Sequence, residues 1–398
     1  MRDINIGKKL SFIVISLSVL VFAIFYYIGE TDHGEESFNL IKEAPSDDAV
    51  TLYVYIKPID SGLSIEARFI SEIISFEVDA FPAAQLQEFL DMTCKTSSHK
   101  YEDVAPLLGE YGQKLFDPIR TFIQRCSEIE FVLGDDKLIP YPFDLLFFQG
   151  KPLFIQKPIA YSFEKVGPGK IDLKEISHAL LISDETADPE RAVLKVRRYI
   201  TRNIYKDIAE VKPDDFKTAG PVDLLLISAH GHIFANQDDY MDFGDERLKA
   251  DDLTGIKPRL VYFDSCFMGA SLDFIELFRS SGVTFYVAPW IPNEAGNSST
   301  KTMCLFFESL DLYSCPVYAL YLTRKQLYDH FSKEGVDFFV LFRSFPFRVY
   351  RFESQSGGGS FGLSSTRLEL MAEGSPEVDP LIYFLAAGYD ESHHFSVL

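Results

Sequence analysis

Apolar runs of strand length alternate with helical stretches along most of this chain. The strand-like runs lie at 51–56, 128–133, 178–183, 224–227, 259–263 and 282–290. Between and after them, apolar residues recur with helical spacing in five stretches, at 108–123, 190–203, 272–278, 303–310 and 317–331. Strands that alternate with helices form parallel sheets covered by helices on both faces. The sequence therefore predicts an α/β fold with a mostly parallel sheet flanked by helices.

Composition narrows the partners that such a fold can have. The chain has 398 residues, with 38 Lys and Arg against 59 Asp and Glu, so its formal net charge is −21. Hydrophobic residues make up 47% of it, which excludes disorder over most of its length. An acidic balance of this size repels phosphate backbones, and no basic stripe interleaved with aromatic residues reverses it locally. We therefore expect no nucleic-acid partner.

The N-terminal region carries an uncharged apolar run at residues 10–28. As a helix it would be about 29 Å long, which matches a hydrocarbon core of about 30 Å. Tyr26 and Tyr27 stand where interfacial aromatic residues are expected, and no small-residue cleavage site follows. The run predicts an uncleaved transmembrane anchor, and the alternative is a cleaved signal peptide.

Charges on the two sides of this run predict its orientation. Arg2, Lys8 and Lys9 precede it, whereas acidic residues follow it at once. The positive-inside rule therefore places the short N-terminus in the cytoplasm and the domain outside, with a cytoplasmic domain as the alternative.

Two segments that carry reactive side chains follow neighbouring strands. His230 and Gly231 come directly after the run at 224–227, and Cys266 comes after the run at 259–263. Open parallel sheets bind their ligands just beyond the carboxyl ends of strands. Cys266 is expected at the start of a helix, where the helix dipole and free N–H groups favour a thiolate.

Consecutive strands are usually neighbours, so these segments are expected to meet at one edge of the sheet. His230 would then accept the thiol proton of Cys266 and later protonate the leaving amine. The N–H groups of Gly231 and Cys266 would stabilise the oxyanion. The sequence thus predicts a Cys–His dyad. The alternative is that His230 is a hydrogen-bonded structural residue and that Cys266 only packs in the core.

A metal site is not expected. His230 and His232 form an HxH pair, but Ile233, Phe234 and Ala235 supply no further ligand. The five cysteines are scattered and none forms a CxxC pair, although a bridge from Cys304 to Cys315 is conceivable in an oxidising compartment. We expect no cofactor.

The order of several short motifs resembles a CHAT domain, a bacterial caspase-like module of the clan CD cysteine peptidases. The motifs are LGEYGQKLFDPIRTFI, LIPYPFDLL, GKPLFIQKPIAYSF, AHG, DSCFMG and GVTFYVAPWIPNEAGNSSTKTM. The resemblance covers roughly residues 50 to 335 and implies a caspase-like fold, with a protein or peptide as substrate. Asp264 and Ser265 depart from the Ser-Ala-Cys pattern that is common in that family. The tetratricopeptide repeats often fused to CHAT domains are absent from this sequence, so an activating partner stays unidentified.

The resemblance also suggests specificity. In metacaspases, which the Asp-Ser-Cys segment resembles, the aspartate lines the primary pocket, so Asp264 would bind an Arg or Lys side chain of the substrate. Trp290 holds the position of the family tryptophan after the last core strand and is a second substrate-binding candidate. The alternative for Asp264 is that it only orients the turn after its strand.

These observations predict five segments. Residues 1–9 form a cytoplasmic N-terminus, 10–28 an anchor, 29–48 an acidic stalk and 49–335 the caspase-like domain, while 336–398 form a β-rich extension in which DFFVLF, FRVYRF and LIYFLAAG look like strands. The predicted function is a membrane-anchored cysteine endopeptidase. The alternative is an inactive caspase-fold binding or scaffold module.

Overall fold

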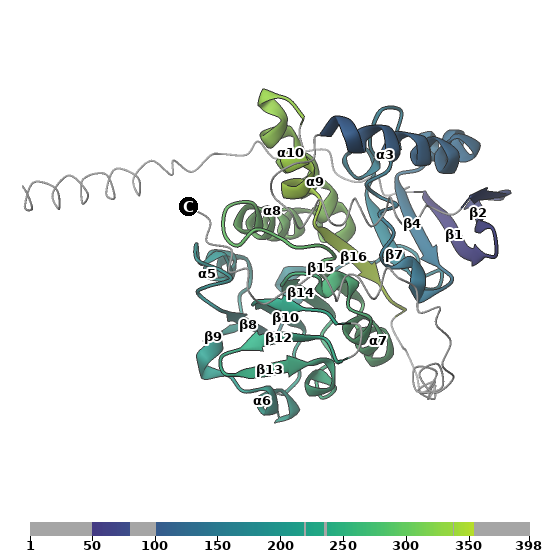
Figure 1. Ribbon diagram of the computed structural model, residues 1–398. Coiled ribbons are helices and arrows are strands. Elements are labelled where there is room, and N and C mark those ends of the chain that lie inside the picture. The colour runs from purple at the N-terminus through teal and green to yellow at the C-terminus, as the bar shows by residue number, and fades with distance from the viewer. Residues whose placement is uncertain (1–49, 80–100, 219, 235–236, 337, 354–398) are drawn as a thin grey trace, which may run out of the picture. The chain divides into compact units, whose positions relative to one another are not determined.

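The computed structural model describes residues 50–79, 101–218, 220–234, 237–336 and 338–353 (Figure 1). The predicted anchor, the stalk and the extension beyond 353 lie outside these residues. No helix in the described ranges is both long enough and apolar enough to cross a membrane.

The main sheet has eleven strands in the order β3-β2-β1-β4-β7-β16-β15-β14-β10-β8-β9. Their bounds are β1 Thr51–Ile59, β2 Gly62–Phe69, β3 Glu72–Asp79, β4 Glu128–Leu133, β7 Ile159–Ser162, β8 Ala179–Ser183, β9 Asn203–Asp207, β10 Leu224–Ser228, β14 Leu260–Asp264, β15 Phe285–Pro289 and β16 Phe347–Arg351. Two small antiparallel sheets consist of β5 Phe147–Phe148 with β6 Lys151–Pro152, and of β11 Gly231–His232, β12 Tyr240–Phe243 and β13 Glu246–Lys249.

The α-helices of the described residues are α3 Tyr101–Phe116, α4 Arg120–Arg125, α5 Ala192–Val196, α6 Pro213–Thr218, α7 Leu272–Ser281, α8 Ser298–Tyr313, α9 Pro316–Phe331 and α10 Phe338–Ser344. Helix α7 ends at Ser281, because Gly282 caps it in the left-handed conformation with φ 82°.

The main sheet consists of two parallel halves that run in opposite directions. Strands β1, β4, β7 and β16 are parallel to one another, and so are β15, β14, β10, β8 and β9. The halves meet where β15 pairs antiparallel with β16, and β2 and β3 extend the first half as an antiparallel meander. The predicted α/β fold with a mostly parallel sheet is confirmed.

Both faces of the sheet are covered. Leu225, Ile227 and Phe263 belong to one buried cluster, which also contains residues of α7, while Leu226 and Tyr262 belong to another with residues of α8. Because successive side chains of a strand point to opposite faces, these clusters are the cores on the two sides of the sheet. Figure 1 shows α7 and α8 beside these strands.

Buried ion pairs hold β16 within the first half of the sheet. Arg351 has no exposed side-chain surface, and its Nη1 lies 2.8 Å from Glu128 and 2.9 Å from Glu130, both on β4. Since a buried charge is costly unless it is paired, each partner requires the others.

Three secondary-structure expectations need correction. The segment DFFVLF at 337–342 was predicted as a strand, but residues from Phe338 onward form helix α10. The predicted helix at 190–203 is shorter, because α5 continues only as a 3₁₀ turn at Arg197–Tyr199 before the edge strand β9 begins at Asn203. A short apolar run fits a buried helix as well as a strand, which explains the first error. FRVYRF does form a strand, but β16 lies in the middle of the main sheet.

Candidate active site

The strands that precede His230 and Cys266 are neighbours in the main sheet. Strand β10 pairs in parallel with β14, and Ser228, the last residue of β10, is opposite Asp264, the last residue of β14. His230 and Cys266 each lie two residues beyond these paired ends. The register therefore brings both residues to the same edge of the sheet, each the same number of residues beyond its strand.

Gly231 brings the two segments into backbone contact. A Cβ atom at this position would lie closer than 3.0 Å to the carbonyl oxygen of Cys266 and 3.2 Å from its backbone nitrogen. Glycine is required here because no other residue permits this approach. The prediction that His230–Gly231 and Cys266 lie together agrees with this packing.

His230 is connected to the end of a third strand. Its Nε2 is 3.0 Å from Thr186 Oγ1, and that hydroxyl donates a 2.8 Å hydrogen bond to Asp184 Oδ1. Asp184 and Thr186 follow β8, the strand on the other side of β10. Because the Thr186 hydroxyl has one proton and donates it to Asp184, its oxygen accepts from the Nε2–H of His230 in this contact.

The sequence reasoning missed Thr186 and Asp184. Both residues follow the strand-like run at 178–183 directly. The same criterion, a polar residue just after a predicted strand, identified His230 and Cys266, so it could have identified these two as well.

Cys266 is half-buried and faces the loop that follows β15. Its Sγ is 3.3 Å from the side-chain oxygen of Asn293 and 3.7 Å from the backbone oxygen of the same residue. Asn293 was not predicted as a site residue.

Cys266 does not stand at the start of a helix, so this expectation is wrong. Phe267 takes a left-handed conformation with φ 64°, a single 3₁₀ turn follows at Met268–Ala270, and α7 begins only at Leu272 with Ser271 as its N-cap. The dipole of α7 is therefore not directed at the thiol, and it supplies no argument for a thiolate.

Asp264 is buried, with 4% of its surface exposed. Ser228 Oγ donates to its Oδ2 at 3.0 Å, while Ser299 Oγ and Asn293 Nδ2 donate to its Oδ1 at 2.6 and 2.7 Å. Burial raises the pKa of this carboxyl to about 6, against the effect of these hydrogen bonds. Its predicted contact with a substrate cation stays a prediction, and three donors of the chain itself already bind it.

Trp290, the second substrate-binding candidate, has no exposed surface. The guanidinium of Arg348 lies 4.0 Å from its ring centroid, and Phe345 contacts it edge-on at 5.7 Å. Here the indole supports the base of the loop that contains Asn293. A contact with substrate stays a prediction.

The remaining histidines and cysteines fall outside the candidate dyad. His232 Nε2 lies 2.9 Å from Asp242 Oδ2, and its ring stacks on Tyr240. No group of three or more potential metal ligands occurs among the described residues. Cys304 and Cys315 are both free thiols in the structure, so the conceivable bridge is not formed, and burial raises the pKa of Cys304 to about 11.

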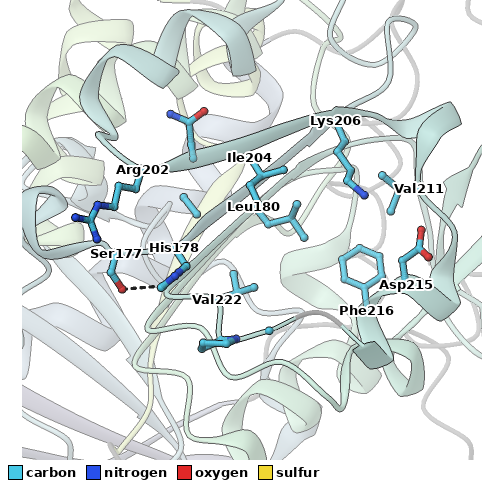
Figure 2. Close-up of a pocket in the computed structure, with 14 residues that line it drawn as sticks. Ser177, His178, Leu180, Arg202, Ile204, Lys206, Val211, Asp215, Phe216 and Val222 are labelled. Carbon is cyan, nitrogen blue, oxygen red and sulfur yellow. Dashed lines mark hydrogen bonds between the residues drawn. The ribbon is translucent and has the colours of Figure 1, made fainter.

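A separate cavity of about 690 Å³ lies over β8 and β9 (Figure 2). Its lining includes Leu180, Ile204 and Phe216 but neither member of the dyad. Near it, Ser177 Oγ donates to Asp223 Oδ2 and also contacts His178 Nδ1 at 2.9 Å.

This Ser–His–Asp cluster does not have the order of a catalytic triad. A triad needs the histidine between the serine and the carboxylate, whereas here the hydroxyl lies between the other two groups. Asp223 also accepts the backbone N–H groups of Ser177 and His178, and hydrogen bonding, first of all from the Ser177 hydroxyl, lowers its pKa. The cluster therefore fixes the start of β8.

No family model matches this chain, and no curated protein matches it.

Proposed function

We propose that this chain is a cysteine endopeptidase of the CHAT type, with Cys266 as nucleophile and His230 as general base. The observation that carries the proposal is the register of β10 and β14, because it sets the two residues at equal distances beyond paired strand ends. The backbone contact at Gly231 supports the same arrangement.

In the proposed reaction, His230 takes the proton of the Cys266 thiol as the sulfur attacks a substrate carbonyl carbon. The N–H groups of Gly231 and Cys266 stabilise the oxyanion that forms. The histidine then returns the proton to the leaving amine, and a water molecule hydrolyses the thioester by the reverse use of the same groups. Thr186, held by Asp184, would orient the His230 ring during these transfers.

Two further features belong to the proposal. An N-terminal anchor at residues 10–28 would hold the domain on the outer side of a membrane, and Asp264 would direct cleavage to bonds after Arg or Lys. A carboxylate in a narrow pocket favours a cation because a neutral side chain leaves it without an ionic partner.

Two substitutions and a chelator test the dyad. Cys266→Ala and His230→Ala should each abolish peptide cleavage while the unfolding midpoint changes little, because neither substitution creates a large cavity. EDTA should leave wild-type activity unchanged. Full activity of Cys266→Ala, or loss of activity with EDTA alone, would contradict the assignment. A peptide library should show cleavage after Arg or Lys, and cleavage after neutral or acidic residues would contradict the role of Asp264.

The alternative is a catalytically inactive binding module with a caspase-like fold. One observation favours it, namely the hydrogen bond from the Cys266 thiol to Asn293. If neither the wild-type chain nor its variants cleave any peptide of the library, this alternative replaces the peptidase.

A further inference from the structure

The Cys266 thiol is directed at a hydrogen-bond acceptor of its own chain. Sγ is 3.3 Å from Asn293 Oδ1, and it also lies 3.7 Å from the Asn293 backbone oxygen. An acceptor that faces a thiol stabilises the protonated form, because a thiolate would be repelled by the oxygen. The reactive form of a cysteine is the thiolate. This contact therefore opposes the chemistry that the site would perform.

The orientation of the Asn293 amide is fixed by its nitrogen. Nδ2 donates to Asp264 Oδ1 at 2.7 Å and to Ser299 Oγ at 3.4 Å. A carboxylate accepts hydrogen bonds and donates none when it is ionised, so the amide cannot turn its oxygen toward Asp264. The oxygen of Asn293 must therefore face the sulfur.

Contacts on both sides of Asn293 hold its loop, residues 291–297, in place. Glu294 contacts Arg343 at 3.3 Å and accepts a hydrogen bond from Ser298, while the backbone N–H of Asn297 donates to Glu190 at 2.7 Å. Asn297 itself has φ 39° and ψ −102°, a conformation that asparagine rarely adopts. These contacts hold the loop against the Cys266 thiol, with a strained backbone at Asn297.

We propose that Asn293 makes an autoinhibitory contact that keeps Cys266 protonated until the loop at 291–297 moves. The inference rests on the proposed function only in treating Cys266 as the nucleophile. It adds a mode of regulation: displacement of the loop frees the thiol from its acceptor, and it frees Asp264 Oδ1 from a donor at the same time.

Titratable groups lie on several elements that bound this site. Asp264 lies on β14, His230 follows β10, and Asp188, whose charge acts on Asp264, follows β8. Glu294 lies in the loop itself and is bound to Arg343. All of these groups remain when Asn293 alone is replaced, so a change in thiol reactivity reports on the Asn293 amide.

Alkylation of the full chain in mild detergent tests the proposal. Iodoacetamide labelling of each cysteine is followed by mass spectrometry between pH 5 and pH 10, with Cys304 as the internal reference. In Asn293→Ala, Cys266 should react about five- to tenfold faster at pH 7. The midpoint of the pH dependence of its alkylation rate should fall by up to about one pH unit, which is the effect of one ordinary hydrogen bond. The rate of Cys304 should not change.

Ser228→Ala is the matched control. It removes a donor to the other oxygen of Asp264 but leaves Asn293 against the thiol, so Cys266 should not react faster. An unchanged or lower Cys266 rate in Asn293→Ala overturns the proposal. So does an equal acceleration of Cys304, which would indicate general loosening, or an equal acceleration in Ser228→Ala, which would place the effect in Asp264.

Peptide cleavage measured on the same samples separates this inference from the proposed function. Faster alkylation without cleavage supports the autoinhibitory contact and contradicts the peptidase. Cleavage by the wild-type chain with no change in alkylation supports the peptidase and contradicts the contact.

Discussion

Replacement of Asp264 by asparagine should change how stability depends on pH. Burial raises the pKa of this carboxyl from 3.8 to about 6 in the folded chain, a difference of about 2 pH units. At 1.36 kcal/mol per unit, this difference equals about 3 kcal/mol of folding free energy. The magnitude is that of a large single-residue effect on a domain stable by only about 5–15 kcal/mol.

The sign follows from which state binds the proton more strongly. Between pH 3.8 and about 6 the folded chain keeps the Asp264 proton, whereas the unfolded chain releases it. The stabilisation by this proton is complete below pH 3.8 and is lost as the pH rises through about 6. Wild type should therefore lose about 3 kcal/mol relative to Asp264→Asn between about pH 4 and pH 7.

Urea unfolding of both chains at several pH values measures this difference. Other carboxyl groups titrate in the same range, but they are shared by the two chains and cancel in the comparison. Asp245→Asn, at an exposed position, controls for the loss of one negative charge from a chain of net charge −21. A constant difference over the range would refute the argument. A wild type that gains stability as the pH rises would show that the three donors outweigh burial.

Two further predictions concern the backbone contact and the orientation. Gly231→Ala should lower the free energy of unfolding by about 1–3 kcal/mol and reduce peptide cleavage by about 100-fold, because the new Cβ displaces Cys266. Gly109→Ala in helix α3, where a Cβ meets nothing within 4 Å, should instead be neutral or stabilising, and equal unfolding midpoints for the two variants would contradict the contact. Protease added to intact cells should digest the domain if the N-terminus is cytoplasmic, whereas protection until lysis would place the domain in the cytoplasm.

The sequence was sufficient to place the segments of His230 and Cys266 at one edge of the sheet because the signal was local. Apolar runs mark buried strands, and the first polar residues after them mark the sheet edge where ligands bind. Since consecutive strands are commonly neighbours, His230 and Cys266 could be placed together without coordinates. The pairing of Ser228 with Asp264 confirms that the two strands are neighbours, although they are not consecutive, because the small strands β11, β12 and β13 lie between them in the chain.

The partners of the dyad could not be predicted in the same way. Asn293 is 27 residues from Cys266, and Thr186 is 44 residues from His230. Both lie in loops, where the direction of a side chain depends on tertiary contacts. The left-handed Phe267, which delays the helix after Cys266, has no sequence signal of the kind that glycine provides.

The sheet places His230 and Cys266, whereas loops supply their side-chain partners. We therefore expect regulation of such a site to act on the loops. The sheet positions the segments that carry His230 and Cys266 through backbone pairing and the close contact at Gly231, so a change there lowers the stability of the fold. By contrast, the proposed autoinhibitory contact is made by the side chain of Asn293. Side-chain contacts such as the ion pair of Glu294 with Arg343 also hold the loop at 291–297 in place. A partly exposed ion pair contributes only about 1 kcal/mol, so binding of a substrate or partner could displace this loop without disturbing the sheet. Activation by loop movement is therefore compatible with a rigid dyad.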